Sequence, residues 1–272
     1  FINFRISAFI RGCIKNLINN FIIFFLRMYI LIDTSYLLFY RIYATKNWFK
    51  KAHPEITDIY TNSIYLEKLE KQTIKCISDL VKKYKTDNVI FLKDCKQSEI
   101  WRNNHVQKYK DGRVNDIPKD VFRFLHNDVI TTLIDKNDYQ AFSMNQLEAD
   151  DIAYICKNTL REKYPDVPIT IITNDNDYLQ LLDENTQLFN LCGKDLRERS
   201  CGDAEKDLLL KIILGDNSDN IPKVFPKCGP KTAEKLLADP SKLEDMLNKE
   251  NYREVFERNR LLIDFRCIPA TL

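Results

Sequence analysis

Short runs of apolar residues alternate along the chain with longer segments in which apolar residues recur at helical spacing. Three runs, at 29–33, 88–92 and 168–172, have the length of buried strands. Residues 62–84 and 146–163 place apolar side chains three and four positions apart, as one face of a helix requires. Strands that alternate with helices are typical of a mostly parallel sheet with helices on both faces. We therefore predict an α/β fold.

The pattern changes after about residue 205. A short helix is expected at 207–214, a loop with Gly and Pro at 215–229, and a second short helix at 231–238. Pro230 precedes the second helix, and proline favours the first helical turn. Because the chain has no internal repeat and no low-complexity linker, we expect this helical part to pack against the sheet.

Acidic residues gather in five small groups, and three of the groups begin where a predicted strand ends. The carboxyl ends of parallel strands share one edge, where open α/β sheets bind ligands, so these acids are expected to converge. Like charges at short range raise one another's pKa unless cations neutralise them. Carboxylate oxygens suit Mg²⁺ or Mn²⁺, and we interpret the pattern as a metal site that hydrolyses phosphodiesters. The groups are Asp33; Asp94; Glu148, Asp150 and Asp151; Asp175 and Asp177; and Asp216 and Asp219.

Each group taken alone also has a simpler explanation. Glu148, Asp150 and Asp151 open a predicted helix, where acids stabilise the N-terminus. Asp175 and Asp177 also fit an ordinary turn after a strand. The metal hypothesis depends on the joint occurrence of acids from independent segments at one edge.

The loop at 214–222 and the stretch at 226–233 together favour phosphate binding. A Gly-containing turn ahead of a helix exposes backbone N–H groups at the positive end of the helix dipole. Lys223, Lys227 and Lys231 add charge around that turn. The alternative is a loop and helix start that merely tolerate Gly and Pro.

Composition sets broader limits. The 272 residues are 44% hydrophobic, enough for one large core or for a core with a small appended domain. A net charge of +2 fits an ordinary mixed surface, but metals that neutralise the acids would leave a basic surface suited to nucleic acid. Eight cysteines without a Cys-x-x-Cys pair favour free thiols over a zinc site or disulfide framework. We therefore expect a reducing, cytoplasmic location and no secretion.

The first 27 residues are treated separately. They include an apolar run at 21–26 that is too short to span a bilayer, and no association with a membrane is expected. Interleaved arginines and a lysine would also fit a targeting sequence. We expect instead an upstream extension or disordered leader, with Met28 as the natural start just before the first strand.

Several motifs, in their order along 28–268, resemble the 5′-nuclease (flap endonuclease) family. The resemblance is closest to the 5′–3′ exonuclease domain of bacterial DNA polymerase I and to phage 5′-exonucleases. It rests on Asp33, the stretch from Trp101-Arg102 to Tyr109-Lys110-Asp-Gly-Arg113, Glu148-Ala-Asp150-Asp151, Thr173-Asn-Asp175-Asn-Asp177-Tyr-Leu-Gln-Leu and Gly215-Asp216-Asn-Ser-Asp219-Asn-Ile-Pro.

The resemblance implies a PIN-like nuclease domain at 28–205 with an arch at about 103–140. It implies a helical C-terminal domain at 206–272 with a helix–three-turn–helix that binds DNA. Two divalent ions, Mg²⁺ with Mn²⁺ as a substitute, are implied with them. One would be held chiefly by Asp94, Glu148, Asp150 and Asp151, with Asp175 between the ions, Asp177, Asp216 and Asp219 toward the second, and Asp33 in support.

The same resemblance assigns roles outside the acid groups. Lys110 and Arg113 sit where the family has cations that contact the scissile phosphate. Arg102 is interpreted as a phosphate anchor or a partner of the acids, and Tyr109 as a base-stacking ring or an ordinary packed one. DNA contacts are expected from the turn and the second helix, at Lys223, Lys227, Gly229, Lys231 and Thr232. Against the family pattern the turn is one residue longer and lacks two glycines, which bears on the K⁺ site that the family often has there.

The resulting prediction is a structure-specific, metal-dependent 5′–3′ exonuclease or flap endonuclease of DNA replication and repair. Expected partners are DNA with 5′ flaps, nicks or duplex ends, RNA–DNA primers and a DNA polymerase. The expected setting is the cytoplasm, at a nucleoid or a viral replication site, and the expected state is a monomer. Two alternatives stay open: a non-catalytic protein that binds DNA junctions, and a PIN-type ribonuclease.

Overall fold

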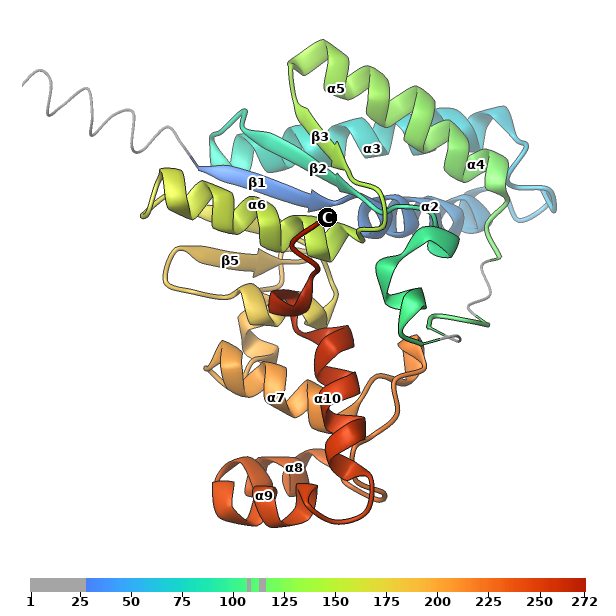
Figure 1. The fold of residues 1–272 in the computed structure, drawn as a ribbon. Helices are drawn as coiled ribbons and strands as arrows, with labels where there is room; N and C mark the ends of the chain where they lie inside the picture. Colours follow the sequence, from blue (N-terminus) through green and yellow to red (C-terminus); the bar gives the residue numbers. More distant parts are fainter. Residues whose placement is uncertain (1–27, 107–108, 113–115) are drawn as a thin grey trace, which may run out of the picture.

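A five-stranded parallel sheet forms the centre of the protein in a computed structural model that describes residues 28–106, 109–112 and 116–272 (Figure 1). The strand order is β3-β2-β1-β4-β5. All four pairings are parallel, with Ile30 opposite Val89 and Ile30 opposite Thr170 on the two sides of β1. The strands are β1 (Tyr29–Asp33), β2 (Val89–Lys93), β3 (Gln140–Ser143), β4 (Ile169–Ile172) and β5 (Thr186–Phe189).

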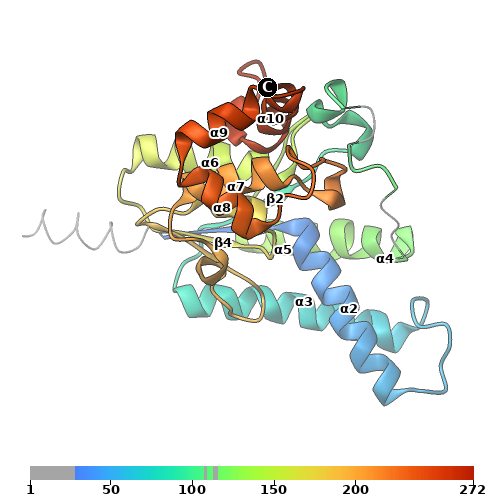
Figure 2. The ribbon, with the colours of Figure 1, turned by 90° about the horizontal axis from the view of Figure 1, so that it is seen from below.

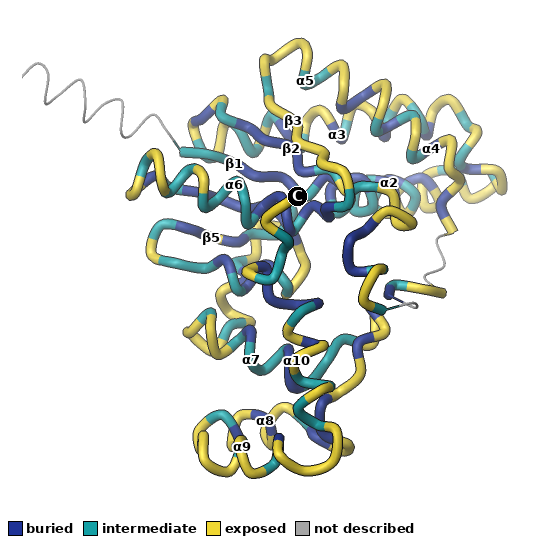
Figure 3. Tube along the Cα trace, in the orientation of Figure 1, coloured by how far each residue is buried: buried dark blue, intermediate teal, exposed yellow. Residues whose placement is uncertain are grey.

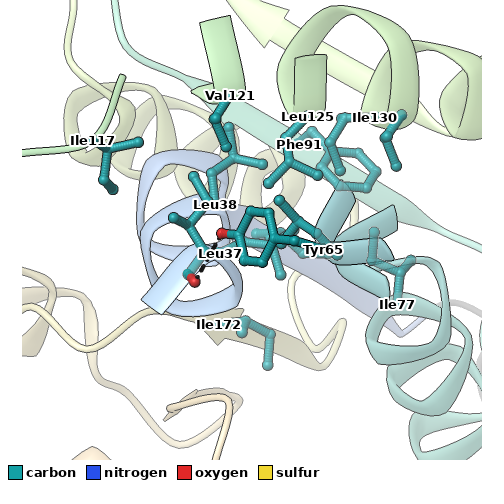
Figure 4. Close-up of a cluster of buried hydrophobic side chains, with 14 of the residues drawn as sticks. Leu37, Leu38, Tyr65, Ile77, Phe91, Ile117, Val121, Leu125, Ile130 and Ile172 are labelled. Carbon is teal, nitrogen blue, oxygen red and sulfur yellow. Dashed lines mark hydrogen bonds between the residues drawn. The ribbon is translucent and has the colours of Figure 1, made fainter. Parts of the chain in front are cut away.

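Helices cover both faces of the sheet. Because side chains alternate across a strand, Ile30 and Ile32 pack toward α2 (Thr34–Ala52) and α3 (Ser63–Tyr84). Leu31 packs on the opposite side, in a second cluster with residues of α6 (Ala149–Lys163). The first cluster is drawn in Figure 4, where the Tyr65 hydroxyl donates to the Ile42 carbonyl at 3.2 Å.

Within the segment predicted to form an arch at 103–140, residues 119–137 form one nearly continuous helical run. It consists of α4 (Lys119–Arg123), a π-helical segment (Phe124–Ile130) and α5 (Thr131–Asn137). Val121, Leu125 and Val129 are buried in the core with α2 and α3. Residues four apart lie on one face of a helix, but polar, charged and aromatic residues separate these apolar positions in the sequence, and the helix was not predicted. The arch at about 103–140 stays a prediction.

Four helices form a C-terminal region beneath the sheet: α7 (Ala204–Leu214), α8 (Pro230–Leu237), α9 (Pro240–Leu247) and α10 (Tyr252–Ile263). Figure 2 shows them gathered on one side, away from the long pair of α2 and α3. Ile213, Phe225 and Leu247 share a small core that joins α7, the following loop and α9. In Figure 3 the outer surfaces of α8 and α9 are largely exposed, whereas the central strands are buried.

The predicted strands and helices are confirmed to within a few residues, and the α/β architecture with them. Two edge strands were not predicted. All four residues of β3 are exposed, so this strand lacks the apolar run on which the prediction depended. Among the described residues no helix is both long and apolar enough to cross a bilayer. All seven cysteines in the described ranges are free thiols.

Candidate metal centre

Acidic side chains line one cavity at the carboxyl edge of the sheet. Asp33 is the last residue of β1, Asp94 follows β2 directly, and Asp175 is the third residue after β4. These three line a cavity of about 510 Å³, and Glu148 and Asp150 at the start of α6 line it as well. The convergence follows from the parallel topology, because every strand delivers its following residue to the same edge.

The first tight group of acids lies at the N-terminus of α6. Glu148, Asp150 and Asp151 each offer a carboxylate oxygen within 4.8 Å of the others. Glu148 and Asp151 form a capping box, in which the Glu148 backbone N–H donates to Asp151 Oδ2 at 3.1 Å. Burial, together with the carboxylates of Asp151 and Glu148, raises the pKa of Asp150 well above its usual value. This corner therefore carries more negative charge than its protein neighbours balance.

Arg102 neutralises the inner part of that group. Its Nη1 lies 2.7 Å from Asp151 Oδ2 and 3.0 Å from Glu148 Oε2, and its Nη2 lies 2.6 Å from Asp151 Oδ1. Arg102 is 2% exposed, and its Nε donates to the Leu262 carbonyl at 2.6 Å. Of the two roles considered for Arg102, the geometry fits a partner of the acids, because a phosphate cannot reach a buried guanidinium.

The second tight group of acids combines the loop after β4 with the loop after α7. Carboxylate oxygens of Asp177, Asp216 and Asp219 lie within 4.8 Å of one another. Lys211, in the last turn of α7, forms ion pairs with Asp177 and with Asp216, the latter at 2.9 Å. Although burial acts in the opposite direction, Lys211 and Ser218 lower the pKa of Asp216 to about 2. The lysine thus provides a positive charge between two of the acids.

Tyr109 and Lys110 connect the two groups. The Tyr109 hydroxyl lies 2.9 Å from Glu148 Oε2 and 3.4 Å from Asp219 Oδ2. The Lys110 ammonium forms an ion pair with Glu148 and lies 3.5 Å from Asp219 Oδ2. Lys110 has a left-handed φ of 54°, and its backbone N–H donates to the Asp219 carbonyl at 3.2 Å. Such a conformation persists only when neighbouring contacts hold it.

The ring of Tyr109 is 5% exposed and packs with Ile100, Ile212 and Ile221. Of its two expected roles, packing fits this arrangement and base stacking does not. Burial lowers the pKa of Lys110, but the Glu148 carboxylate outweighs that effect and raises the pKa well above its usual value. Lys110 is therefore a permanent cation at the wall of the cavity.

Asp33 and Asp94 complete the cavity on the sheet side. Asp33 accepts hydrogen bonds from the Tyr36 N–H at 2.9 Å and from the Thr173 hydroxyl at 3.0 Å. Asp94 accepts from the Ser35 hydroxyl at 2.5 Å and from the Ala149 N–H at 2.8 Å. Burial first, and then the Asp94 carboxylate, raises the pKa of Asp33 to about 7. With this pKa, the protonated and ionised forms of the carboxyl group are both populated at neutral pH, and a nearby cation would favour the ionised form.

The residues present fit divalent metal ions. Two groups of three carboxylates provide only oxygen ligands, which suits Mg²⁺ or Mn²⁺. Burial first, and then neighbouring carboxylates, raise the pKa values of Asp33 and Asp150, so a bound cation would favour the ionised forms of these acids. Within the first group, Arg102 occupies both oxygens of Asp151, and Glu148 accepts from Arg102 and Tyr109 at one oxygen and from Lys110 at the other, so Asp150 is the best placed as a direct ligand.

The remaining candidate residues lie on the turn between α7 and α8, apart from the acid cavity. Gly229 is the N-cap of α8 and is partly exposed. Lys227 has a left-handed φ of 60°, and the Lys223 ammonium donates to the Cys228 carbonyl at 2.8 Å. Lys231 and Thr232 are exposed in the first turn of α8. Arg113 lies outside the described residues.

Sequence reasoning missed Lys211. Its position five residues before Asp216 is a usable signal, because a long basic side chain in the last turn of a helix can reach acceptors at the end of that helix. A second cavity, of about 530 Å³, extends from Asp177, Lys211 and Asp216 to Pro230 at the start of α8. The two cavities share Asn176, Lys211 and Asp216 in their walls, so the acid cavity borders one that reaches the first residue of α8.

Comparison with known proteins gives a family match. The model described as the 5′-3′ exonuclease, N-terminal resolvase-like domain, matches residues 28–207. DNA polymerase I of Streptococcus pneumoniae (strain R6) is 29% identical over 230 residues, which cover 79% of this chain and 24% of the polymerase. The 5′-3′ exonuclease of Buchnera aphidicola (subsp. Baizongia pistaciae) is 29% identical over 233 residues, which cover 81% of this chain and 69% of the exonuclease.

Solved structures share the fold. The T5 D15 protein co-crystallised with metal ions matches with a TM-score of 0.64 at 21% identity, over 88% of this chain and 90% of that chain. A bacteriophage T5 D15 flap endonuclease complex with DNA and metal ions matches with a TM-score of 0.64 at 20% identity, over 88% and 89%. The chain spans only about a quarter of the polymerases that it matches, and more than two thirds of the stand-alone exonuclease above.

Proposed function

Because the chain belongs to the 5′–3′ exonuclease family, we propose that it is a metal-dependent nuclease that hydrolyses DNA phosphodiesters at or near a 5′ end. The observation that supports this most is the set of carboxylates that five separate segments bring to one cavity and its border. A fold kept only for binding DNA would gain nothing from so many like charges, because they repel phosphate in the absence of metal.

The first metal position would use Glu148 and Asp150, with Asp94 and Asp175 on the same cavity wall. The second would use Asp177, Asp216 and Asp219. Divalent ions bound there supply a water nucleophile at neutral pH and stabilise the oxygen that leaves. Mg²⁺ is the proposed ion, with Mn²⁺ as a substitute, because both prefer oxygen ligands.

The protein's own residues orient the phosphodiester and balance charge. Lys110 lines the cavity and keeps its proton, so it can bind a phosphate oxygen and offset the negative charge that develops there. Arg102 and Tyr109 hold Asp151 and Glu148 in place from the buried side. Asp33 keeps Thr173 in position at the start of the loop that carries Asp175.

DNA would run from the acid cavity toward α8. The second cavity links Asp216 to Pro230, and Lys227 and Lys231 are exposed beside it in sequence. Backbone N–H groups at a helix start and nearby lysines bind backbone phosphates without reading bases, which suits 5′ flaps, nicks and duplex ends. A K⁺ ion at this turn belongs to the same proposal, as does a role beside a DNA polymerase in replication and repair, in the cytoplasm.

A cleavage assay tests this proposal. We expect Mg²⁺-dependent cutting of 5′-labelled flap, nicked and blunt DNA, with loss of cutting in EDTA. Asp175→Ala should abolish cleavage and leave flap binding measurable, whereas Asp245→Asn, which changes an exposed acid of α9, should cut normally. Flap binding without cutting would instead favour the non-catalytic junction binder. Preferential cutting of single-stranded RNA would favour the ribonuclease.

A further inference from the structure

Arg199 forms hydrogen bonds with the loop that carries Asp175 and Asp177, from outside the acid cavity. It is the last residue of the 3-10 helix η5 (Leu196–Arg199), which lies in the connection between β5 and α7. Its Nη1 donates to the Asn174 carbonyl at 3.0 Å and to Asn176 Oδ1 at 3.1 Å. Its Nη2 donates to Asn174 Oδ1 at 2.8 Å. One guanidinium thus spans the three-residue segment centred on Asp175.

Besides Arg199, the same loop is held by the Asp177 N–H, which donates to Asp175 Oδ1 at 3.0 Å, and by Asn190 Nδ2, which lies 3.5 Å from Asn174 Oδ1. Thr173 and Tyr178 are buried, but Asn174, Asp175 and Asn176 between them are exposed. Asn and Asp alternate from 174 to 177. The side chains of Asn174 and Asn176 accept hydrogen bonds from Arg199, which leaves Asp175 and Asp177 available to the acid cavity and its border. An exposed loop that must hold two carboxylates in register loses conformational entropy whenever a metal orders it.

The support behind Arg199 is rigid. Leu196 is fully buried in the sheet core, and Asp195 accepts from the Arg197 N–H at 2.8 Å at the start of the same helix. Arg197 points the other way, and its Nη2 donates to the carbonyls of Asp183 at 3.3 Å and Thr186 at 3.2 Å. The backbone of Arg199 therefore belongs to a well-anchored helix, and its hydrogen bonds restrict the motion of the loop that carries Asp175.

The hydrogen-bond acceptors of Arg199 leave its positive charge available to the nearby acids. Within the described residues, the three hydrogen bonds of the Arg199 guanidinium go to neutral carbonyl oxygens of the backbone and of two amides, so no carboxylate bonded there cancels its charge. The arginine and the acids share one short loop, and both Arg199 and Asp177 line the second cavity. Its charge opposes the mutual repulsion of Asp175 and Asp177 without occupying a ligand oxygen of either.

We propose that Arg199 is a positioning residue that presets the spacing of Asp175 and Asp177 and thereby raises the affinity of the acid cavity for divalent metal. The proposal rests on the metal-dependent nuclease function given above. Residues that orient metal ligands from behind typically change metal affinity by about 10- to 100-fold when they are removed. Neither the acid pattern nor the family match assigns a role to this arginine.

The test compares Arg199→Ala with Arg197→Ala, a matched change of the same residue type in the same short helix. Free Mn²⁺ is measured by electron paramagnetic resonance in titrations of the full chain without DNA. We expect Arg199→Ala to weaken Mn²⁺ binding about 10-fold, and Arg197→Ala to leave it within about twofold. Arg199→Lys keeps the charge but cannot donate from two separate nitrogens, so its Mn²⁺ affinity should lie between those of wild type and Arg199→Ala.

A second readout separates positioning from general damage. In cleavage assays Arg199→Ala should need about 10-fold more Mg²⁺ for half-maximal rate, yet regain most of the wild-type rate at saturating Mg²⁺. Thermal unfolding in EDTA should be similar for the Arg199 and Arg197 variants. If Arg199→Ala fails to fold, Asn176→Ala removes one acceptor from the loop side and should weaken Mn²⁺ binding in the same direction.

The proposal would be overturned if Arg199→Ala and Arg197→Ala weakened Mn²⁺ binding equally, or if Arg199→Ala left Mn²⁺ binding unchanged. The binding titration does not depend on cleavage. A wild-type protein that binds Mn²⁺ but cuts no nucleic acid would end the proposed function, while a selective loss of Mn²⁺ in Arg199→Ala would still support the positioning role.

Discussion

Arg102 holds the carboxylate of Asp151 at both oxygens, with N–O distances of 2.7 and 2.6 Å, although 49 residues separate the two positions in the chain. Both side chains are buried. The pair fixes the start of α6 against the segment at 101–104, and Trp101 adds a hydrogen bond to the same carboxylate at 3.2 Å. One acid of the metal centre is thereby already neutralised by the protein itself.

Replacing Arg102 should be costly. Arg102→Ala leaves Asp151 and Glu148 buried without their cation, and breaking a buried pair by removing one partner costs about 3–5 kcal/mol. Urea unfolding in EDTA measures the loss. Arg123→Ala is the control, because its ion pair with Asp120 is exposed and worth less than about 1 kcal/mol. Equal losses in the two variants would contradict the assigned role of Arg102.

Gly215 is required by the close approach of the loop that follows it. Its φ is +65°, and a Cβ there would lie 2.4 Å from the Ile221 carbonyl oxygen and 2.5 Å from that of Pro222. Gly215→Ala should therefore displace Asp216 and Asp219, with a loss of roughly 3 kcal/mol or more in stability and weaker Mn²⁺ binding.

Gly193→Ala provides the comparison for Gly215. Gly193 has a φ of +81° but open space around it, so alanine there meets only the backbone penalty of about 1–2 kcal/mol. Chemical denaturation and Mn²⁺ titration of both variants check the prediction. A Gly215→Ala protein that is no worse than Gly193→Ala in both measurements would refute the steric argument.

Lys211 competes with metal for the second group of acids. Its ammonium lies between Asp177 and Asp216, so a divalent ion that binds there must displace it or share its ligands. Lys211→Met should tighten Mn²⁺ binding in the absence of DNA by about fivefold, since a partly exposed ion pair is worth on the order of 1 kcal/mol. Lys206→Met, on the exposed start of the same helix, should have no effect. Unchanged or weaker binding in Lys211→Met would show that the lysine does not compete.

Asp183 makes stability depend on pH at a place remote from the metal centre. Burial would raise the pKa of Asp183, but Lys157, Thr186 and Asn185 lower it to about 2, below the usual 3.8. A lowered folded-state pKa contributes stability that is complete above about pH 4 and disappears as the pH falls toward 2. The stability difference between wild type and Asp183→Asn should therefore be largest at neutral pH.

Urea unfolding of wild type and Asp183→Asn at several pH values between 7 and 3 measures this effect. The expected difference is on the order of 1 kcal/mol at pH 7, because the carboxylate is partly exposed, and it should shrink toward acid pH. Asp166→Asn, which changes an exposed aspartate near β4, controls for the loss of one charge. A difference that grows as the pH falls would have the wrong sign.

Much of the fold was predictable because its central strands are buried on both faces and read as short apolar runs. Strand β3 was missed because Gln140 and Ser143 are polar and every residue of the strand is exposed. The helical run at 119–137 was missed because its buried residues, Val121, Leu125, Val129 and Ile130, are few among polar, charged and aromatic neighbours, so the segment has no clear apolar period. These are places where tertiary packing, and not local pattern, decides the structure.

The gathering of acids at one edge was also predictable, because parallel strands end together. Their individual roles were not. The sequence contains nothing to distinguish Asp151, whose oxygens are occupied by Arg102, from Asp150, which lines the open cavity. Likewise, Tyr109 reads equally well as a stacking ring or a packed one until its burial among residues of α7 and the following loop is known.

By itself, then, the sequence determined that carboxylates from independent strand ends would meet, since strand direction alone requires it. Only the tertiary structure decided which carboxylates keep their oxygens for an ion and which give them to Arg102, Lys110 or Lys211. The physical reason is that an ion pair forms only where packing brings two side chains within a few ångströms of each other. The partners of Arg102 and Lys110 lie 38 to 49 residues away in the chain, and Lys211 pairs with the loop that follows its own helix. Those distances come from how the helices pack on the sheet, and no local pattern encodes them.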